Sequence, residues 1–556
     1  MARAGLNPHP AIVAPGRSIW DRLGLAELPL MLLLVTAAAC LVRASGVPVV
    51  QGTMGRDEAR LALAARGILE HGLPILEGGF LYTRGLVPAY LNAATFAVLG
   101  PTDQTAKLTD LLFSTLLVLV VYRLGRLAGG RRPAMAAAII VAFSPPLVLQ
   151  GREAWLYNTF LLWTALALGW LVRDEPGDRV RAGLAALVAL AIDLGRAWTA
   201  RRRKPHPPAP ETGVALTPRP PLPTMGEGET IRTSAVLPSP SQGRGAGGEG
   251  FRSVIVFWAI LLAGTSAVCI LSLMLRAPTL GGPTTEIREY LRPGFDLRGL
   301  ESTLEIIGSW HPWLLPVAIL GLPLTRSSWR AWIAGRGVAP CLLMVLAIVA
   351  FNSFGLVRRG ESRYVLAAIP FLAVVAAVSL DRVGPSIVAA LSGRRRLGHA
   401  RHITRFALLT VLVAVSLDPA RLLADAQSRA VANTWVQAVA GRAPDDLVVS
   451  FAPTLTSHYL GKTDFWLRTE MYSKYVWADR PPYRDVHTGA IVIRSPAELE
   501  RLLLVPYQGR TAWVVLAGPP GSEGSREMRE LTRQLGALAV ETRRPADGRV
   551  VLRLQL

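Results

Sequence analysis

Cysteine is almost missing from this chain: only three occur in 556 residues, and none stands at the spacing of a metal-ligand pair. Cys40, Cys269 and Cys341 each lie inside an apolar run, so we expect small buried apolar side chains at these positions. This scarcity excludes a cysteine-based metal site. It carries no information about the redox compartment.

Acidic residues are also few: 39 Asp and Glu stand against 60 Lys and Arg, and the formal net charge is +21. In a soluble protein such an excess favours a nucleic-acid partner. Here the arginines gather in short loops between apolar runs, which is typical of the cytoplasmic loops of membrane proteins. We therefore expect contact with membrane lipids and no nucleic-acid partner.

Apolar sequence is what the chain has in abundance, since 51% of its residues are hydrophobic. They cluster in runs of roughly 15–23 residues, near the length that an α-helix needs to cross a bilayer. Two weaker stretches, 86–100 and 182–198, predict interfacial or partial crossings. The nine stronger runs predict membrane spans at about 28–43, 108–122, 133–150, 155–172, 253–275, 309–325, 338–355, 364–382 and 404–419.

The distribution of basic loops predicts the orientation of these spans. Arginines gather near 123–132, 326–336 and 394–405, and all three groups fall on the cytoplasmic side if the N-terminus is also cytoplasmic. The sequence thus predicts a multi-pass protein of the cell membrane. Its fold class is mainly α, a polytopic bundle of about 9–11 spans with a small C-terminal α/β domain outside the cytoplasm.

The expected organisation has five parts. The cytoplasmic N-terminus is 1–27, a first membrane module is 28–198 with an outer loop at 44–107, and a second membrane module is 253–420. Between the modules, 199–252 is rich in Pro, Gly and Ser and predicts disorder. In the extracytoplasmic domain, 421–556, strands are expected at 447–451, 490–494, 512–518 and 550–556, and helices at 495–504 and 525–538.

The outer loop contains the first candidate site residues, Asp57 and Glu58, at the start of an amphipathic helical pattern. Carboxylates are favourable near any helix N-terminus, so a purely structural role is one interpretation. The other is chemical: a carboxylate at the membrane face can take a proton from a hydroxyl group or hold a divalent metal. No full set of oxygen ligands is visible, so a metal (Mg²⁺ or Mn²⁺) stays an open alternative and no cofactor is assigned.

Cations on the same side of the membrane suggest a phosphate site. Snorkelling to the interface, local pairing of Arg152 with Glu153, and contact with lipid phosphates are the competing interpretations. The candidates for binding phosphate are Tyr82, Arg84, Lys107, Arg152, Arg358, Arg359 and Arg363. The candidates for binding the sugar or the acceptor are Glu153, Tyr157 and Tyr364.

Four segments together resemble the GT-C glycosyltransferases, in particular the glycosyltransferase family 39-like branch of protein O-mannosyltransferases, aminoarabinose transferases and Rgt-type enzymes. They read GRDEARLALAARGILEHG (55–72), YTRGLVPAYLNAATFAVLG (82–100), GREAWLY (151–157) and ESRYVLAAIPFL (361–372). The chain departs from related enzymes after Tyr82, where Arg84-Gly85-Leu86 replaces a common Lys-Pro-Pro.

The resemblance implies inverting transfer of a sugar from a polyprenyl-phosphate donor to a lipid, glycan or protein acceptor at the non-cytoplasmic face. Asp57 would then be the catalytic carboxylate with Glu58 beside it, and the cations would hold the donor phosphate. A transporter or flippase of lipid-linked sugar is an alternative, but no internal repeat or mid-membrane polar cluster supports it. An inactive scaffold protein is a second alternative, in which Asp57 would be dispensable.

Overall fold

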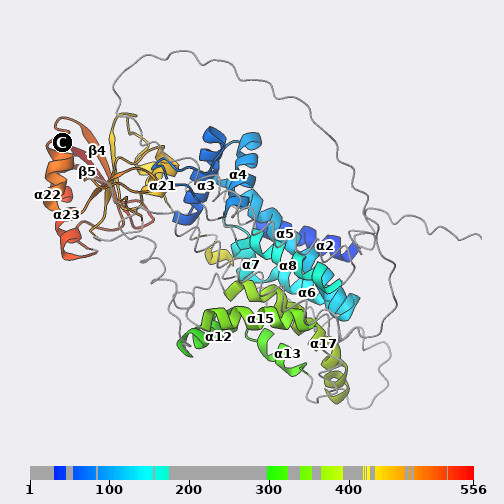
Figure 1. Cartoon of the computed structure of the whole chain (residues 1–556). Coiled ribbons are helices and arrows are strands. Elements are labelled where there is room, and N and C mark those ends of the chain that lie inside the picture. The colour runs from blue at the N-terminus through cyan, green and yellow to red at the C-terminus, as the bar shows by residue number, and fades with distance from the viewer. Residues whose placement is uncertain are drawn as a thin grey trace, which may run out of the picture.

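The computed structural model describes two regions of the chain in detail. The first is 30–173, without 46–53, 83–84 and 155–156. The second is 297–556, without 323–337, 354–364, 392–417, 470–474, 478–480, residue 523 and several residues within 419–432. A helical bundle and a sheet domain make up these residues, and helices α3 (Arg56–His71) and α4 (Leu86–Leu99) lie between them (Figure 1). The predicted segments 1–27 and 182–275 lie outside the described residues.

The bundle follows the apolar runs of the sequence. Among the described residues, Asp103–Gly129 and Leu366–Gly384 are long and apolar enough to cross a membrane, and three shorter apolar helices accompany them. The total number of spans stays a prediction. The bundle elements are α2 (Leu30–Ala44), α5 (Asp103–Gly129), α6 (Arg131–Phe143), α7 (Pro145–Gln150), α8 (Tyr157–Arg173), α12 (Leu297–Trp310), α13 (Leu314–Leu320), α15 (Val338–Ser353), η1 (Leu366–Ala368) and α17 (Ile369–Leu391).

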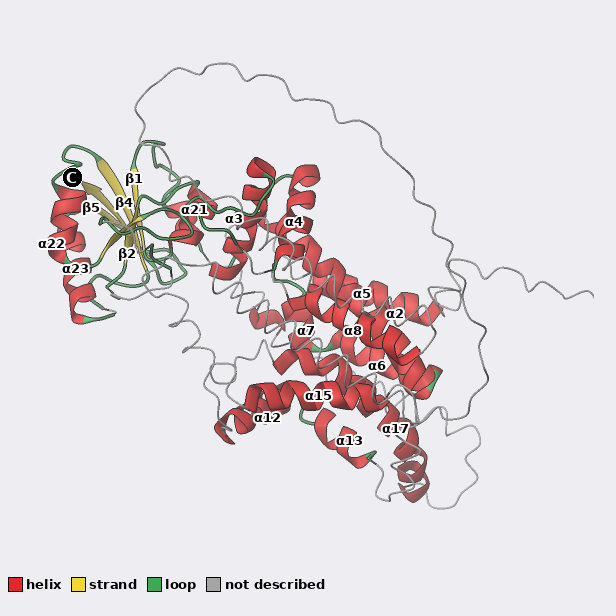
Figure 2. Ribbon diagram, viewed as in Figure 1, coloured by secondary structure: helices red, strands yellow, loops and turns green. Residues whose placement is uncertain are grey.

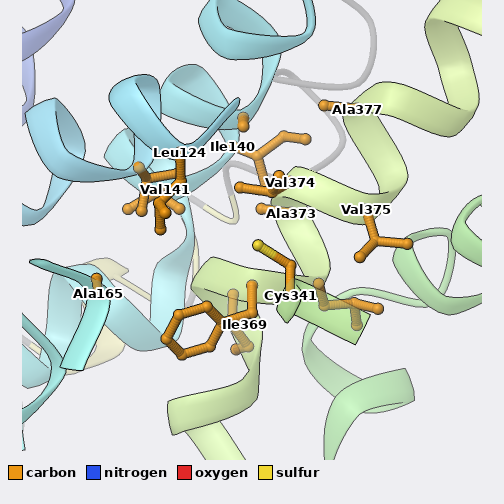
Figure 3. Packing of buried hydrophobic residues seen from close by; sticks show 14 of the residues in the cluster. Leu124, Ile140, Val141, Ala165, Cys341, Ile369, Ala373, Val374, Val375 and Ala377 are labelled. Carbon is orange, nitrogen blue, oxygen red and sulfur yellow. The ribbon is translucent and has the colours of Figure 1, made fainter. Parts of the chain in front are cut away.

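One buried apolar cluster holds these helices together (Figure 3). Cys341 of α15 is fully buried in it near Ala373 and Val374 of α17, as predicted for a small apolar side chain. Small residues permit close helix contacts. At Gly125 of α5 an added Cβ would lie 2.6 Å from the Cα of Ala134 in α6, so these two helices touch through their backbones.

Two predicted spans are interrupted. The run 133–150 forms α6 and α7 with a break at Ser144, and the run 309–325 forms the end of α12 and α13 with a break at 311–313. Proline follows in both places, Pro145 in the first and Pro312 in the second. The residue before a proline is driven out of the helical region, so a continuous helix was the wrong prediction for both runs.

The C-terminal residues form a six-stranded mixed sheet with helices (Figure 2). The strand order is β3-β2-β1-β4-β6-β5, with parallel pairs from β3 to β4 and antiparallel pairs from β4 to β5. The elements are α20 (Trp435–Ala438), β1 (Leu447–Ser450), α21 (Pro453–Leu460), β2 (Phe465–Leu467), β3 (Ile491–Ile493), α22 (Pro496–Leu499), η2 (Glu500–Leu504), β4 (Thr511–Leu516), α23 (Arg526–Ala537), β5 (Ala539–Arg543) and β6 (Val550–Gln555).

The four predicted strands and both predicted helical segments are confirmed. Ser495 caps α22 by accepting a hydrogen bond from the Glu498 amide at 3.2 Å, as its position predicts. The sequence analysis missed β2 and β5. The first has three residues, and the second, AVETR, has no buried position and exposes Val540, so neither gives a strong apolar signal.

The two faces of the sheet are covered by different parts of the chain. Successive side chains on a strand point to opposite faces. In β4, Val514 lies in a buried cluster with Leu531 of α23. Its neighbours Trp513 and Val515 lie in a second cluster with Ala62 of α3. Helices α20 and α21 of the C-terminal domain belong to this second cluster too, and α3 packs on α21, so the outer loop is fixed against the C-terminal domain.

Candidate active site

The first turn of α3 places the two candidate carboxylates in different environments. Glu58 is 3% exposed, whereas the side chain of Asp57 is 48% exposed. Both benefit from the positive end of the helix dipole. Only Asp57, however, lies where a substrate in solution or at a membrane surface can reach it.

Glu58 is bound to two backbone amides. Its carboxylate accepts hydrogen bonds from Gly55, just before α3, and from Ala154, in the loop after α7, the second at 2.7 Å. A carboxylate that receives backbone N–H donors is well satisfied when buried. Glu58 therefore joins the outer loop to the GREAWLY segment, and this role is positional.

Asp57 is held by Arg60, one helical turn further along α3. The Arg60 Nη1 atom lies 2.8 Å from Asp57 Oδ1. The Arg60 guanidinium also lies over the ring of Tyr475, 5.0 Å from its centre, and the Arg468 guanidinium lies 5.8 Å from the same centre. The surroundings of Asp57 thus come from both the outer loop and the C-terminal domain.

Arg152 is buried, at 4% exposure, and its contacts are internal. Its Nη2 atom donates to the carbonyl of Val42 near the end of α2 at 2.8 Å, and its Nη1 atom lies 3.8 Å from Asp425. Binding of a donor phosphate by Arg152 stays a prediction.

Arg43, which the sequence analysis did not single out, lies close to this region. Its guanidinium donates to the carbonyls of Val141 and Ala142 at 3.1 and 2.8 Å. Those carbonyls would normally accept from the amides four residues ahead, which belong here to Pro145 and Pro146 and have no N–H. Arg43 therefore replaces the two missing donors, and the proline pair was the signal that two carbonyls here need another donor.

The remaining predicted residues fall into two groups. Three are described: Tyr82 of the outer loop is 7% exposed, Lys107 of α5 is completely buried, and Tyr157 is the first residue of α8. A buried ammonium requires a compensating anion. The others lie outside the described residues: Arg84, Arg358, Arg359, Arg363 and Tyr364.

Two stretches of the C-terminal domain contact the outer loop directly. The carbonyl of His487 accepts the Gly78 amide at 3.0 Å, and its ring lies edge-on to Phe80 with centroids 5.3 Å apart. His458 and Tyr459 contact Asp103 at the start of α5, at 3.2 and 2.9 Å. Both stretches therefore pack against the first membrane module.

A metal ligand set is not seen in the part of the chain that the structure describes, where no three His, Cys, Asp or Glu side chains gather. Asp57 has an arginine, not a second carboxylate, as its close neighbour.

Comparison with known proteins bears on the fold. The family profile described as dolichyl-phosphate-mannose-protein mannosyltransferase matches residues 83–194. No curated protein sequence matches the chain. The match, together with the two structures described next, shows a GT-C-type fold, as the resemblance in the sequence predicted, and supports a membrane location.

Two solved structures show this fold over nearly the whole chain. ArnT from Cupriavidus metallidurans in its apo state superimposes with a TM-score of 0.55 at 16% identity, covering 94% of this chain and 97% of ArnT. ArnT bound to undecaprenyl phosphate gives a TM-score of 0.54 at 15% identity, covering 95% and 98%.

Proposed function

We propose that this protein is a membrane glycosyltransferase that moves a sugar from a polyprenyl-phosphate donor to a hydroxyl acceptor at the non-cytoplasmic face. The observation that carries the proposal is the exposed Asp57 carboxylate at the α3 N-terminus, held by Arg60 between the helical bundle and the C-terminal domain. The GT-C fold and the likeness to a structure that contains undecaprenyl phosphate support it.

The chemistry is a single displacement. The acceptor oxygen bonds to the anomeric carbon while the bond from that carbon to the phosphate oxygen breaks, and polyprenyl phosphate leaves with the electron pair. The proton of the acceptor hydroxyl passes to Asp57. Attack from the side opposite the phosphate inverts the configuration of the sugar.

Cations assist the departure of the phosphate by stabilising the charge that develops on it. We assign this role to Lys107 and Arg152 among the described residues, together with Arg84 and the arginines of 358–363. Tyr82 is assigned to the same phosphate site. Glu153, Tyr157 and Tyr364 are assigned to the sugar or the acceptor.

Sugar transfer by the full chain in proteoliposomes tests the proposal. Undecaprenyl-phosphate sugars radiolabelled in the sugar are supplied with a mixture of lipid, glycan and protein acceptors. Asp57→Asn should reduce transfer by about 10²–10⁴-fold, the usual contribution of a general base. Its thermal stability should stay within about 0.5 kcal/mol of the unaltered chain, because the side chain is exposed.

Glu70→Gln is the matched control, since Glu70 is also an exposed carboxylate of α3 and lies at the opposite end of the helix. It should transfer sugar normally. Equal transfer by Asp57→Asn and the unaltered chain would remove Asp57 as the base. An unaltered chain that binds the lipid-linked sugar and moves it across the bilayer without transfer would instead establish the flippase alternative.

A further inference from the structure

The ring of Tyr475 joins the C-terminal domain to the carboxylate of Asp57. Arg60 is the intermediate: its guanidinium lies 5.0 Å from the centre of the Tyr475 ring, and its Nη1 atom lies 2.8 Å from Asp57 Oδ1. An arginine over an aromatic face is attracted to it and also stacks on it through its flat guanidinium. One side chain of α3 is therefore bound at once to the carboxylate and to a ring from the sheet domain.

The Tyr475 ring itself is fixed from other directions. Arg468, which follows β2, lies 5.8 Å from its centre and 4.7 Å from the centre of the Trp466 ring. The ring of His487 lies 5.4 Å from Tyr475. Arg60 thus stacks on a surface that the C-terminal domain holds in place.

The stack strengthens the hold of Arg60 on Asp57. An i,i+3 pair contributes little by itself, and the side chain of Asp57 is half-exposed. A catalytic carboxylate requires a defined orientation, because a small displacement of a reacting group strongly reduces the rate. The stack removes the freedom of the arginine, and the arginine then orients the carboxylate through Oδ1.

We propose that Tyr475 is a positioning residue, which orients the Asp57 carboxylate through Arg60. This inference rests on the proposed function, because it concerns the base of that reaction. It gives the C-terminal domain a part in the chemical step itself, in addition to any contact with an acceptor. The residue contacts neither donor nor acceptor in this role and acts only through the arginine.

The test uses hydrolysis of the donor, which needs no identified acceptor. Water replaces the acceptor: its oxygen bonds to the anomeric carbon, the bond from that carbon to the phosphate oxygen breaks, one proton passes to Asp57, and free sugar and undecaprenyl phosphate are released. The full chain in proteoliposomes is given undecaprenyl-phosphate sugars labelled with tritium in the sugar. Released sugar is measured against donor concentration, so that kcat and KM are obtained separately.

Tyr475→Ala should lower kcat by about tenfold to a hundredfold with the KM for the donor unchanged. Tyr475→Phe, which keeps the ring, should restore kcat to within about twofold of the unaltered chain. Arg60→Gln should lower kcat at least as much as Tyr475→Ala. The double variant should be no slower than Arg60→Gln alone, because both substitutions remove one chain of contacts.

Arg60→Lys keeps the charge beside Asp57 and the aliphatic stem of a side chain that is only 18% exposed, and it loses the flat stack. It should lower kcat by about tenfold to a hundredfold, the effect expected for Tyr475→Ala. This variant tests the proposal even if Tyr475→Ala fails to fold. Tyr507→Ala is the matched control, because Tyr507 also carries an arginine over its ring, Arg510 at 5.7 Å, in the cluster on the other face of the sheet.

The outcomes separate the two proposals. An active chain in which Arg60→Lys keeps full kcat, or in which the effects of Tyr475→Ala and Arg60→Gln multiply, would overturn the role of Tyr475 and leave the proposed function standing. An unaltered chain that neither hydrolyses nor transfers any of the sugars would overturn both.

Discussion

The hydroxyl of Tyr459 donates a hydrogen bond to the buried carboxylate of Asp103 at 2.9 Å, and this contact joins the C-terminal domain to the first turn of α5. The same hydroxyl accepts the backbone amide of Met54 at 2.8 Å. Burial, and then the charge of Asp103, raise the pKa of Tyr459, so the hydroxyl keeps the proton that it donates. One side chain therefore holds together the sheet domain, α5 and the start of the outer loop.

Tyr459→Phe should lower the free energy of unfolding by about 1–3 kcal/mol, because it leaves a buried carboxylate and a buried amide each short of a partner. Thermal unfolding of the full chain in detergent measures the change. Tyr507→Phe, on the other face of the sheet, serves as the control and should change the midpoint little. Equal midpoints for the two variants would show that the Asp103 contact does not contribute to stability.

Substitution of Glu58 should lower the stability of the protein, whereas substitution of Asp57 should leave the stability nearly unchanged. Glu58→Ala removes the acceptor of the Gly55 and Ala154 amides and should destabilise the protein by about 1–3 kcal/mol. Glu58→Gln keeps one acceptor oxygen and should lose less. Thermal unfolding compares these variants with Asp57→Asn. Equal unfolding midpoints for Glu58→Ala and the unaltered chain would show that this carboxylate does not stabilise the outer loop.

Gly78→Ala should weaken the contact between the outer loop and the C-terminal domain. An added Cβ would lie 2.5 Å from the carbonyl oxygen of Val486 and 2.7 Å from that of Asp485, and backbone atoms cannot move aside cheaply. Overpacking of this kind costs about 1–3 kcal/mol. Limited proteolysis and thermal unfolding measure the loss.

Gly441→Ala is the control for that substitution, because nothing lies within 4 Å of the Cβ that it would add. It should match the unaltered chain in both measurements. The same behaviour of Gly78→Ala would mean that the loop and the domain separate readily at this point.

The stability of the protein should decline in acid partly through Asp485. Burial alone would raise the pKa of this carboxyl, but hydrogen bonds from His487 and Thr488 outweigh it and hold the pKa below the usual value of 3.8. A lowered pKa stabilises the folded protein at any pH above the unfolded-state pKa of about 3.9. That stabilisation is lost as the pH falls through the lower folded-state pKa.

Asp485→Asn removes this titration. The difference in unfolding midpoint between the unaltered chain and Asp485→Asn should therefore be largest at neutral pH and should shrink below about pH 4. Thermal unfolding from pH 7 to pH 3 measures it. A difference that is constant over this range would show that the ionised carboxylate is not the stabilising form.

The sequence predicted most elements of the fold because apolar runs and strand patterns are local signals. It placed β1, β3, β4 and β6 and most helices of the bundle, and it missed most of α12. It failed at 133–150 and 309–325, where a proline outweighs a continuous apolar run. It identified Asp57 from its position at a helix start. The different environments of Asp57 and Glu58 could not be predicted, because they depend on the contact of Glu58 with Ala154, nearly a hundred residues away.

The contribution of the C-terminal domain to the site was equally beyond local signals. Arg60 has an ordinary i,i+3 relationship to Asp57 in the sequence, and its stacking on Tyr475 exists only through the docking of the domain. Arg43 shows the opposite case. Its two carbonyl partners could have been inferred from the absence of N–H groups in Pro145 and Pro146, although the arginine that meets them could not.

The position of β6 inside the sheet, between β4 and β5, has a consequence for biosynthesis. The sheet cannot close until Val550–Gln555 has been synthesised, whereas α3 is complete at His71. At about 5–20 residues per second, tens of seconds separate the two events. During this interval the alanine face of α3 has no assembled C-terminal domain to pack against, and Arg60 has no ring to stack on. Asp57 thus acquires its surroundings only at a late stage of translation.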